Sequence, residues 1–331
     1  MTTHRGTWGR YLIAVVLVWG VACVAAYFYS QQKGIAGSVA MAVLPAFLAE
    51  IALYILPGFE DVRAAISGLP KARTATLLTV VAVVPWALAT VPLGEFGFVL
   101  LAGVAAIAAL VAFWYVALKP GLAADLTFLA IIAAAILSHA FRLLYPAPSP
   151  ALPLEILGRL MLVHTGIIAV LCIRGLDAGF GFVPQPREWA IGLLFTLCFL
   201  PIGAGLGAAL HVARWHPAVA VTWKLPLVAI ARFAGVLWVV ALTEEFFVRG
   251  FLQQILARSL KSDATGLVIA SVAFGALHLP FGAFPNWRFA TIAAIAGLFY
   301  GAAFIRTRGI RAPMVMHALI VTAWQLLFNA R

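Results

Sequence analysis

Long apolar runs constrain this chain more than any other feature of its sequence. Hydrophobic residues make up 64% of its 331 residues and charged residues only 10%, so a water-soluble protein could not cover its surface with polar groups. A helix needs roughly 20 apolar residues to cross the ~30 Å hydrocarbon core of a bilayer. Backbone groups in lipid must bond within their own segment, so each run predicts a helix. We therefore predict an all-α, polytopic transmembrane helical bundle.

The apolar runs give about eleven candidate spans, with a range of eight to eleven, and those near residues 265 and 289 are among the shortest. The candidates are residues 11–28, 35–56, 75–93, 96–118, 121–141, 156–173, 189–210, 225–248, 265–279, 289–305 and 312–328.

The basic balance of the chain predicts its orientation. A net charge of +11 would suggest nucleic acid in a soluble protein, but excess lysine and arginine in a membrane protein marks cytoplasmic loops. A cytoplasmic N-terminus places most of these residues in inner loops. We expect a multi-pass integral protein of a prokaryotic inner (plasma) membrane. The lipid bilayer is a partner and nucleic acid is not.

A polar joint at residues 177–187 separates two modules of different character. Residues 1–180 form an N-terminal transmembrane module of unknown role, with few polar groups in its spans. For Glu50, Asp125, Arg159 and His164 we expect bonds to neighbouring helices or contact with the interface. Residues 181–331 form a second module, in which intramembrane polar residues are denser.

The densest charge inside a span is Glu244-Glu245-Phe246-Phe247-Val248-Arg249. An ionisable group at membrane depth costs several kcal/mol, roughly 2.5–3.5 on insertion scales, so the cluster is a functional-site hypothesis. Glu245 and Arg249 are four residues apart and share a helix face, which predicts an ion pair. Glu244 points about 100° away, and both the neighbouring charge and the low dielectric favour its protonated form. Such a carboxyl suits general-base catalysis near neutral pH. The alternative is an ion-pair network that only fixes helix packing.

Two histidines follow on the next apolar helices. His278 comes four residues after Phe274, and Gly275 and Ala276 between them permit close helix approach. His317 follows Pro313 near the C-terminus. Each histidine alone is ambiguous, but both together with an acidic pair indicate a site.

Two chemistries fit this set of residues. Two histidines and a glutamate are the ligands of a catalytic zinc site, which here would be Glu244, His278 and His317. The same groups can instead activate a water directly and stabilise an oxyanion. No HExxH-type spacing is present, so the residues alone leave both open.

The pattern resembles the CPBP family of intramembrane proteases, also called CAAX-protease or abortive-infection-like proteins. The family's EExxxR motif reads Glu244 to Arg249, its FxxxH motif reads Phe274 to His278, and its last motif reads His317-Ala318. The glycine-rich stretch at residues 297–301 is also similar. The resemblance covers about residues 189–328 and makes residues 181–331 the protease domain.

The resemblance implies a hydrolase that cuts a peptide bond near the C-terminus of membrane-associated or lipidated proteins. In this family's pattern Glu244 and His278 activate the water and His317 helps to hold the oxyanion. Glu245, Arg249 and Phe274 support the site. A glutamic mechanism is favoured over zinc, with no cofactor, and the partner is a membrane-associated protein or peptide substrate.

One departure from the family concerns the oxyanion. The family usually has Asn four residues after the last histidine, where this chain has Val321. Removing one oxyanion donor costs roughly 10²–10³ in rate. Either Thr322 or Gln325 on the same helix substitutes, or His317 acts alone, or activity is weak.

The predicted spans put Glu244 and His317 near one membrane face and His278 towards the other. A shared site therefore requires either that the helix of Glu244 continues through residues 252–260, or that the helix before His278 is short and tilted. Two other functions compete with proteolysis: a proton- or cation-coupled transporter using the same groups, and a catalytically weakened family member that acts as a membrane scaffold.

Overall fold

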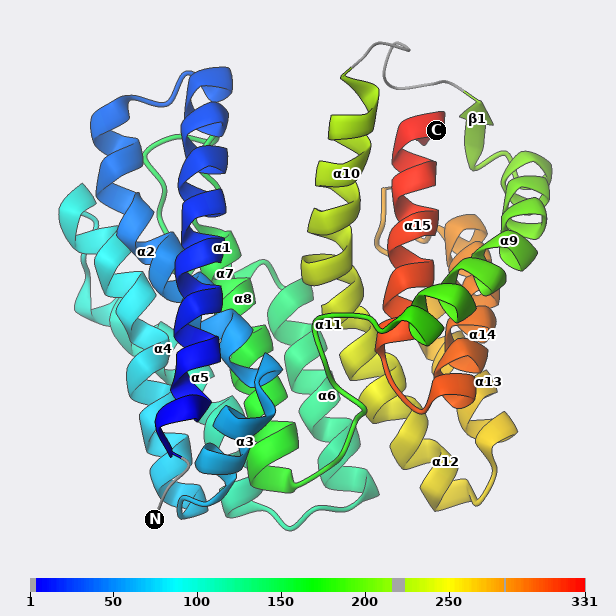
Figure 1. The fold of residues 1–331 in the computed structure, drawn as a ribbon, viewed down its shortest axis with the longest axis horizontal. Coiled ribbons are helices and arrows are strands. Elements are labelled where there is room, and N and C mark those ends of the chain that lie inside the picture. Colours follow the sequence, from blue (N-terminus) through cyan, green and yellow to red (C-terminus); the bar gives the residue numbers. More distant parts are fainter. Residues whose placement is uncertain (1–3, 216–223, 283, 331) are drawn as a thin grey trace. The chain divides into compact units, whose positions relative to one another are not determined.

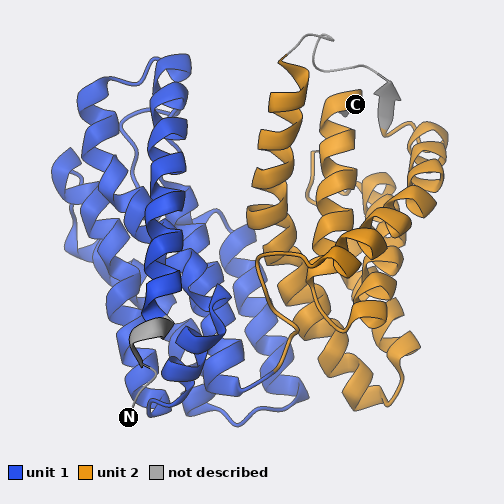
Figure 2. Ribbon diagram, in the orientation of Figure 1, with its two compact units in different colours: residues 1–176 blue, residues 177–331 orange. Residues whose placement is uncertain are grey.

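The computed structural model describes residues 4–215, 224–282 and 284–330, and this part of the chain is predominantly helical (Figure 1). The chain divides into two compact units, Met1–Leu176 and Asp177–Arg331 (Figure 2). Each unit is described separately below.

The first unit holds helices α1 to α8. Their bounds are α1 His4–Lys33, α2 Gly37–Ile55, η1 Leu56–Gly58, α3 Glu60–Ser67, α4 Lys71–Leu93, α5 Phe98–Ala117, α6 Leu122–Leu137, α7 Ala140–Leu144, α8 Glu155–Ile168 and the π-helical η2 Ala169–Arg174.

The second unit holds helices α9 to α15 and two three-residue strands. Their bounds are α9 Pro186–Ala209, β1 Ala213–Trp215, α10 Leu225–Gly235, η3 Val236–Ala241, α11 Leu242–Glu245, η4 Phe246–Gln253, α12 Gln254–Leu260, α13 Asp263–Ala276, α14 Trp287–Thr307, α15 Arg311–Leu327 and β2 Phe328–Ala330.

Eight helices of the described chain are long and apolar enough to cross a membrane. The predicted polytopic helical bundle is therefore confirmed, with a span count at the lower end of the predicted range. Three of the eleven predicted spans fall short of the 18 residues required, with 16 residues in α6, 14 in α13 and 17 in α15. α6 stops where His139 adopts a positive φ of 55°. α13 stops at Ala276, four residues before Pro280, which cannot continue a helix.

The first unit is organised around the continuous helix formed by α8 and η2. Its most apolar window is 78% buried, whereas the windows of α1, α2, α4 and α5 are at most 33% buried and present their outer faces. α8 packs against α2, α4 and α5. On its buried face, His164 bonds Glu50 of α2, with 2.8 Å between Nδ1 and Oε1, and at its end Arg174 bonds Asp125 of α6. Glu50, His164 and Asp125 thus link helices, as the sequence predicted, whereas Arg159 pairs with Glu155 of its own helix.

The second unit contains one helix of 36 residues, Leu225–Leu260, built from α10, η3, α11, η4 and α12. The span predicted at residues 225–248 was too short, because the apolar face continues through Phe251, Ile255 and Leu256, all of which are buried. Glu244 therefore lies in the interior of a helix rather than near its end. The predicted spans had placed Glu244 and His278 near opposite membrane faces. The longer helix of Glu244 and the short α13 before His278 together remove this conflict.

The remaining helices of this unit enclose a core around Phe274, Tyr300 and Met316. α14 packs against α13, α15 and α9. The approach of α13 to α14 requires glycine at position 275, since a Cβ there would lie 2.6 Å from the backbone oxygen of Ala290. The glycine in the stretch before His278 is thus explained by close helix packing, as predicted.

Candidate active site

Glu244 and Glu245 lie on a four-residue α segment, α11, between two π-helical segments. η3 precedes it with six residues and η4 follows it with eight. π turns are rare and occur frequently at functional sites. Both irregular segments of this long helix thus border the acidic pair, while α10 and α12 at its ends are regular.

Glu245 is the buried member of the pair. Its side chain is fully covered and makes the predicted ion pair with Arg249, at 3.3 Å between Oε2 and Nε. The Arg249 guanidinium is 1% exposed, donates to the backbone oxygen of Gly297 at 3.4 Å, and lies 4.2 Å from the ring centre of Phe274. A buried carboxylate is tolerated only when paired, so Arg249 and its surroundings hold Glu245 in place.

Glu244 is the accessible member of the pair. Its side chain is 31% exposed, against 0% for Glu245. Its Oε2 lies 3.8 Å from Nε2 of His317 and is buried without a hydrogen-bond partner in the described chain, whereas Oε1 is not among the buried atoms. One oxygen of the carboxylate therefore faces the histidine and the other stays open to a reactant.

His317 of α15 lies between the two glutamates. Its Nδ1 is 2.7 Å from Oε1 of Glu245 and its Nε2 faces Glu244. A carboxylate can only accept, so Nδ1 carries a proton and donates it to Glu245. This bond fixes the ring, and the remaining nitrogen is directed at the accessible carboxylate.

Tyr300 of α14 is a site residue that sequence reasoning missed. Its ring is 3% exposed and stacks on the His317 ring, with centroids 4.8 Å apart and an interplanar angle of 2°. The Arg249 guanidinium lies 5.1 Å from the centre of the same ring. The only signal in the sequence was its place between Gly297 and Gly301, in the stretch that resembles the family.

His278 lies just beyond the end of α13 and is half-buried. Its Nδ1 is 2.8 Å from the backbone oxygen of Phe274, so Nδ1 donates and Nε2 carries the lone pair. The ring packs against Phe274 at 4.6 Å and stacks on Phe281 at 5.0 Å. In the described chain no hydrogen bond or ion pair joins His278 to Glu244; the Phe274 ring lies next to both histidine rings, 6.1 Å from that of His317. The structure thus puts His317 directly against Glu244.

In the described chain, Glu244, His278 and His317 are not grouped as a set of three metal ligands. Across the described ranges, no group of three or more histidine, cysteine or acidic side chains could hold a metal ion. Each histidine bonds through Nδ1, which leaves Nε2 of His278 and Nε2 of His317 available, as a water-activating or a metal-binding imidazole requires alike.

The two substitutes predicted for the missing Asn are poorly placed. Thr322 is buried and its hydroxyl has no partner in the described chain, but it lies about 140° around the helix from His317. Gln325 is exposed, and its backbone oxygen accepts a bond from Arg232 at 2.9 Å. Val321, about 40° from His317, shares its face but has no donor.

Comparison with known proteins identifies the region that contains this site. Residues 224–323 match the family model described as type II CAAX prenyl endopeptidase, Rce1-like. The match includes Glu244, His278, Tyr300 and His317 and lies wholly in the second unit. No curated protein and no solved structure gives a match.

Proposed function

Because the second unit carries a domain of the Rce1-like CAAX endopeptidase family, a family of peptidases, we propose that this protein is an intramembrane endopeptidase. Its substrates are membrane-associated or lipidated proteins, cut near their C-terminus. The observation that carries the proposal is an accessible carboxylate, Glu244, held against a histidine by a buried Glu245–Arg249 pair inside an apolar helix.

Glu244 acts as the general base. Its open oxygen accepts a proton from a water molecule as the water oxygen bonds to the carbon of the scissile peptide. When the carbon–nitrogen bond breaks, the same proton passes to the leaving amine. His278 supports this step, because its Nε2 lone pair can accept a hydrogen bond from the water.

His317 stabilises the negative charge that develops on the peptide oxygen. Its Nδ1–H is bonded to Glu245, which fixes the ring, and when Nε2 also carries a proton it donates towards the oxyanion. Arg249 pairs with Glu245 and Glu245 bonds His317, so the pair acts through His317 rather than on the substrate.

Tyr300 supplies the oxyanion donor that the family's usual Asn would provide at the position of Val321. Its hydroxyl has no hydrogen-bond partner in the described chain and is not among the sealed polar atoms, although its ring is buried. The ring stacks parallel to His317, so its hydroxyl is fixed relative to that imidazole, and in this proposal both donate to the same oxygen. A preorganised phenol is a known form of oxyanion donor.

The substitution Glu244→Gln tests the proposal, because it keeps the shape of the side chain and removes the base. We expect cleavage of a C-terminally tagged, membrane-anchored reporter in proteoliposomes to fall by about 10³-fold. Unchanged cleavage would contradict the proposal. Wild-type vesicles that show pH-dependent ion flux but no cleavage would favour the transporter. Partner binding without turnover in the wild type would favour the scaffold.

A further inference from the structure

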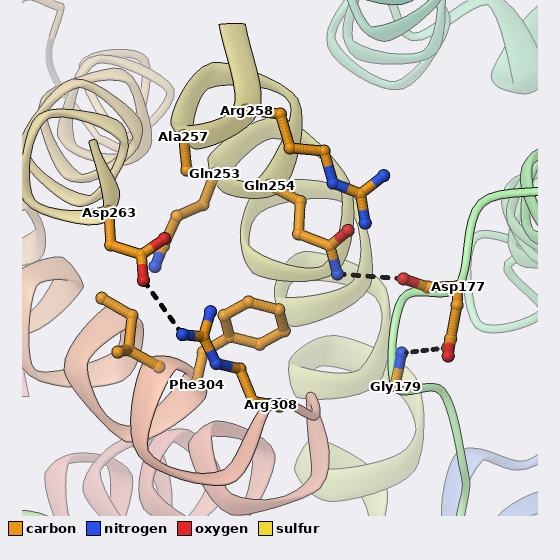
Figure 3. Close-up of a pocket in the computed structure, with 10 residues that line it drawn as sticks. Asp177, Gly179, Gln253, Gln254, Ala257, Arg258, Asp263, Phe304 and Arg308 are labelled. Atoms are coloured by element: carbon orange, nitrogen blue, oxygen red, sulfur yellow. Dashed lines mark hydrogen bonds and ion pairs between the residues drawn. The ribbon is translucent and has the colours of Figure 1, made fainter. Parts of the chain in front are cut away.

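A polar cavity lies in the C-terminal unit, apart from the acidic pair. Its volume is about 320 Å³, and Figure 3 shows side chains of three helices and of the segment at Asp177 around it. Gln253 follows Glu244 by nine residues, which places the cavity on the order of 10 Å further along the helix. Its polar lining includes Asp177, Gln253, Gln254, Arg258, Asp263 and Arg308.

The cavity lies where the apolar helices of this unit end. α12 ends at Leu260, α13 begins at Asp263 and α14 ends at Thr307. Charged side chains gather at helix ends because the membrane–water interface lies there. Those at this end include Arg258, Lys261, Asp263, Arg306, Arg308 and Arg311. A bilayer crossed by these helices would have its lipid headgroups at the level of the cavity.

Gln253 forms the buried floor of the cavity. Its side chain is 2% exposed, and its Nε2 donates to the backbone oxygen of Gly301 at 3.2 Å. That bond fixes the orientation of the amide, because a flipped amide would place oxygen against oxygen. Its Oε1 is buried and has no partner in the described chain. The floor of the cavity therefore lacks a hydrogen-bond donor for this oxygen. Leaving a buried acceptor unpaired costs about 1–3 kcal/mol, which a ligand with an N–H group would recover.

Gln254 repeats this arrangement. Its Nε2 donates to the backbone oxygen of Asp177 at 3.0 Å, and its Oε1 also has no partner in the part of the chain described. The carboxylates of Asp177 and Asp263 line the same cavity. Two free amide oxygens between two acidic side chains match a primary ammonium group, which has three N–H donors and a positive charge.

Arginines on the rim provide the opposite charge. Arg308 pairs with Asp263 at 3.1 Å, whereas exposed Arg258 has no hydrogen bond or ion pair within the described residues. A guanidinium matches the geometry of a phosphate with two parallel hydrogen bonds. The cavity therefore offers an anion site next to its ammonium site.

We propose that this cavity binds the phosphoethanolamine headgroup of a membrane lipid. The ammonium lies against Gln253, Gln254 and the acidic side chains, and the phosphate lies against Arg258. Both glutamine oxygens are covered in this structure, so the ammonium reaches them when the side chains that cover them move aside, while each amide keeps its Nε2 bond. The volume lies at the lower end of the roughly 300–1,000 Å³ found for small-ligand sites.

Native mass spectrometry of the full-length protein with three lipids tests this proposal. Phosphatidylcholine has the same phosphate but no N–H donor, and phosphatidylglycerol has no ammonium. We expect phosphatidylethanolamine to be retained about tenfold more strongly than either, the effect of one charge-assisted hydrogen bond. Equal retention of phosphatidylethanolamine and phosphatidylcholine would overturn the proposal. Equal retention of phosphatidylethanolamine and phosphatidylglycerol would also overturn it, because it would indicate a site for the phosphate alone.

Variants of lining residues test whether the preference for phosphatidylethanolamine arises from this cavity. Arg258→Ala and Asp177→Asn should each reduce retention of phosphatidylethanolamine by about tenfold, because each removes one charge. Arg306→Ala, an exposed arginine at the same end that does not line the cavity, should change it less than about twofold. A loss as large in Arg306→Ala would contradict a specific site. If free O-phosphoethanolamine binds as strongly as the lipid, the proposal that the headgroup comes from a membrane lipid is overturned.

Discussion

The two units of this protein each contain a buried glutamate bonded to a histidine and accompanied by a tyrosine. In the first unit Glu50 and His164 lie 2.8 Å apart with side chains 0% and 2% exposed. In the second unit Glu245 and His317 lie 2.7 Å apart and are 0% and 5% exposed. Distance and burial therefore do not distinguish the two pairs.

The surroundings do distinguish them. The pair in the second unit has a partly exposed carboxylate, Glu244, on the other side of the same imidazole, and Arg249 beside the buried one. Glu50 is flanked in sequence by Ala49 and Ile51. In the first unit a buried glutamate–histidine pair connects helices, and the accessible acid beside the second pair is what the proposed chemistry requires.

The tyrosines differ in the same way. The hydroxyl of Tyr145 is sealed and has no hydrogen-bond partner in the described chain. Burial, and then the negative charge of Glu50, raise the pKa of Tyr145, so this phenol stays protonated across the physiological range. The hydroxyl of Tyr300 is not sealed. The first unit is therefore a natural control for the second.

The histidines should show the largest difference between the units. His317→Gln removes the proposed oxyanion donor and should lower turnover by about 10²–10³-fold. The counterpart His164→Gln, in the first unit, should leave turnover within about threefold of the wild type, since its ring links α2 and α8. Reporter cleavage by both purified variants measures this. Equal losses would show that both pairs take part in one function.

Arg249 should matter most for stability. Arg249→Met leaves Glu245 buried without its cation, and breaking such a pair costs about 3–5 kcal/mol. Adding Glu245→Leu removes the stranded charge and should restore most of the lost free energy of unfolding. Chemical denaturation in detergent measures both. A double variant no more stable than Arg249→Met would show that the charge is not the cause.

Tyr300→Phe should have an intermediate effect on the rate. It keeps the stacked ring and removes only the hydroxyl, so we expect kcat to fall by about 10–100-fold with KM little changed. Tyr145→Phe in the first unit is the matched variant and should leave kcat unchanged. If Tyr300→Phe is fully active, Tyr300 only packs against His317 and another group stabilises the oxyanion.

The smallest effect on turnover belongs to Glu50. Glu50→Gln keeps a hydrogen-bonding group for His164 but removes the charge, so we expect a loss of about 1–3 kcal/mol in stability. Cleavage per folded molecule should stay at the wild-type level. A tenfold loss of kcat without unfolding would contradict the division of roles between the units.

Part of this site could be predicted from the spacing of residues along the sequence. The Glu245–Arg249 pair follows from a separation of four residues on a helix, and the glycine at 275 follows from helix packing. The contacts of His317 with Glu245 and with Tyr300 join helices that are distant in sequence, so no periodicity reveals them.

The limits of the helices were harder to predict than their number. The end of the long helix was misplaced because the apolar run stops before Arg249, whereas in the structure the guanidinium is buried and paired and the helix continues. His278 was expected beside Glu244, yet the turn after Ala276 directs its ring onto Phe274 and Phe281. Both depend on tertiary packing, which residue patterns do not contain.

The most direct test of the account compares Glu244→Gln and Glu50→Gln in the same preparation, with kcat for reporter cleavage and the free energy of unfolding measured for each. We predict that Glu244→Gln loses about 10³-fold in kcat with stability within about 1 kcal/mol of the wild type, because its carboxylate is partly exposed. Glu50→Gln should show the reverse. An active Glu244→Gln variant, or a loss of kcat of equal size in both variants, would contradict the account.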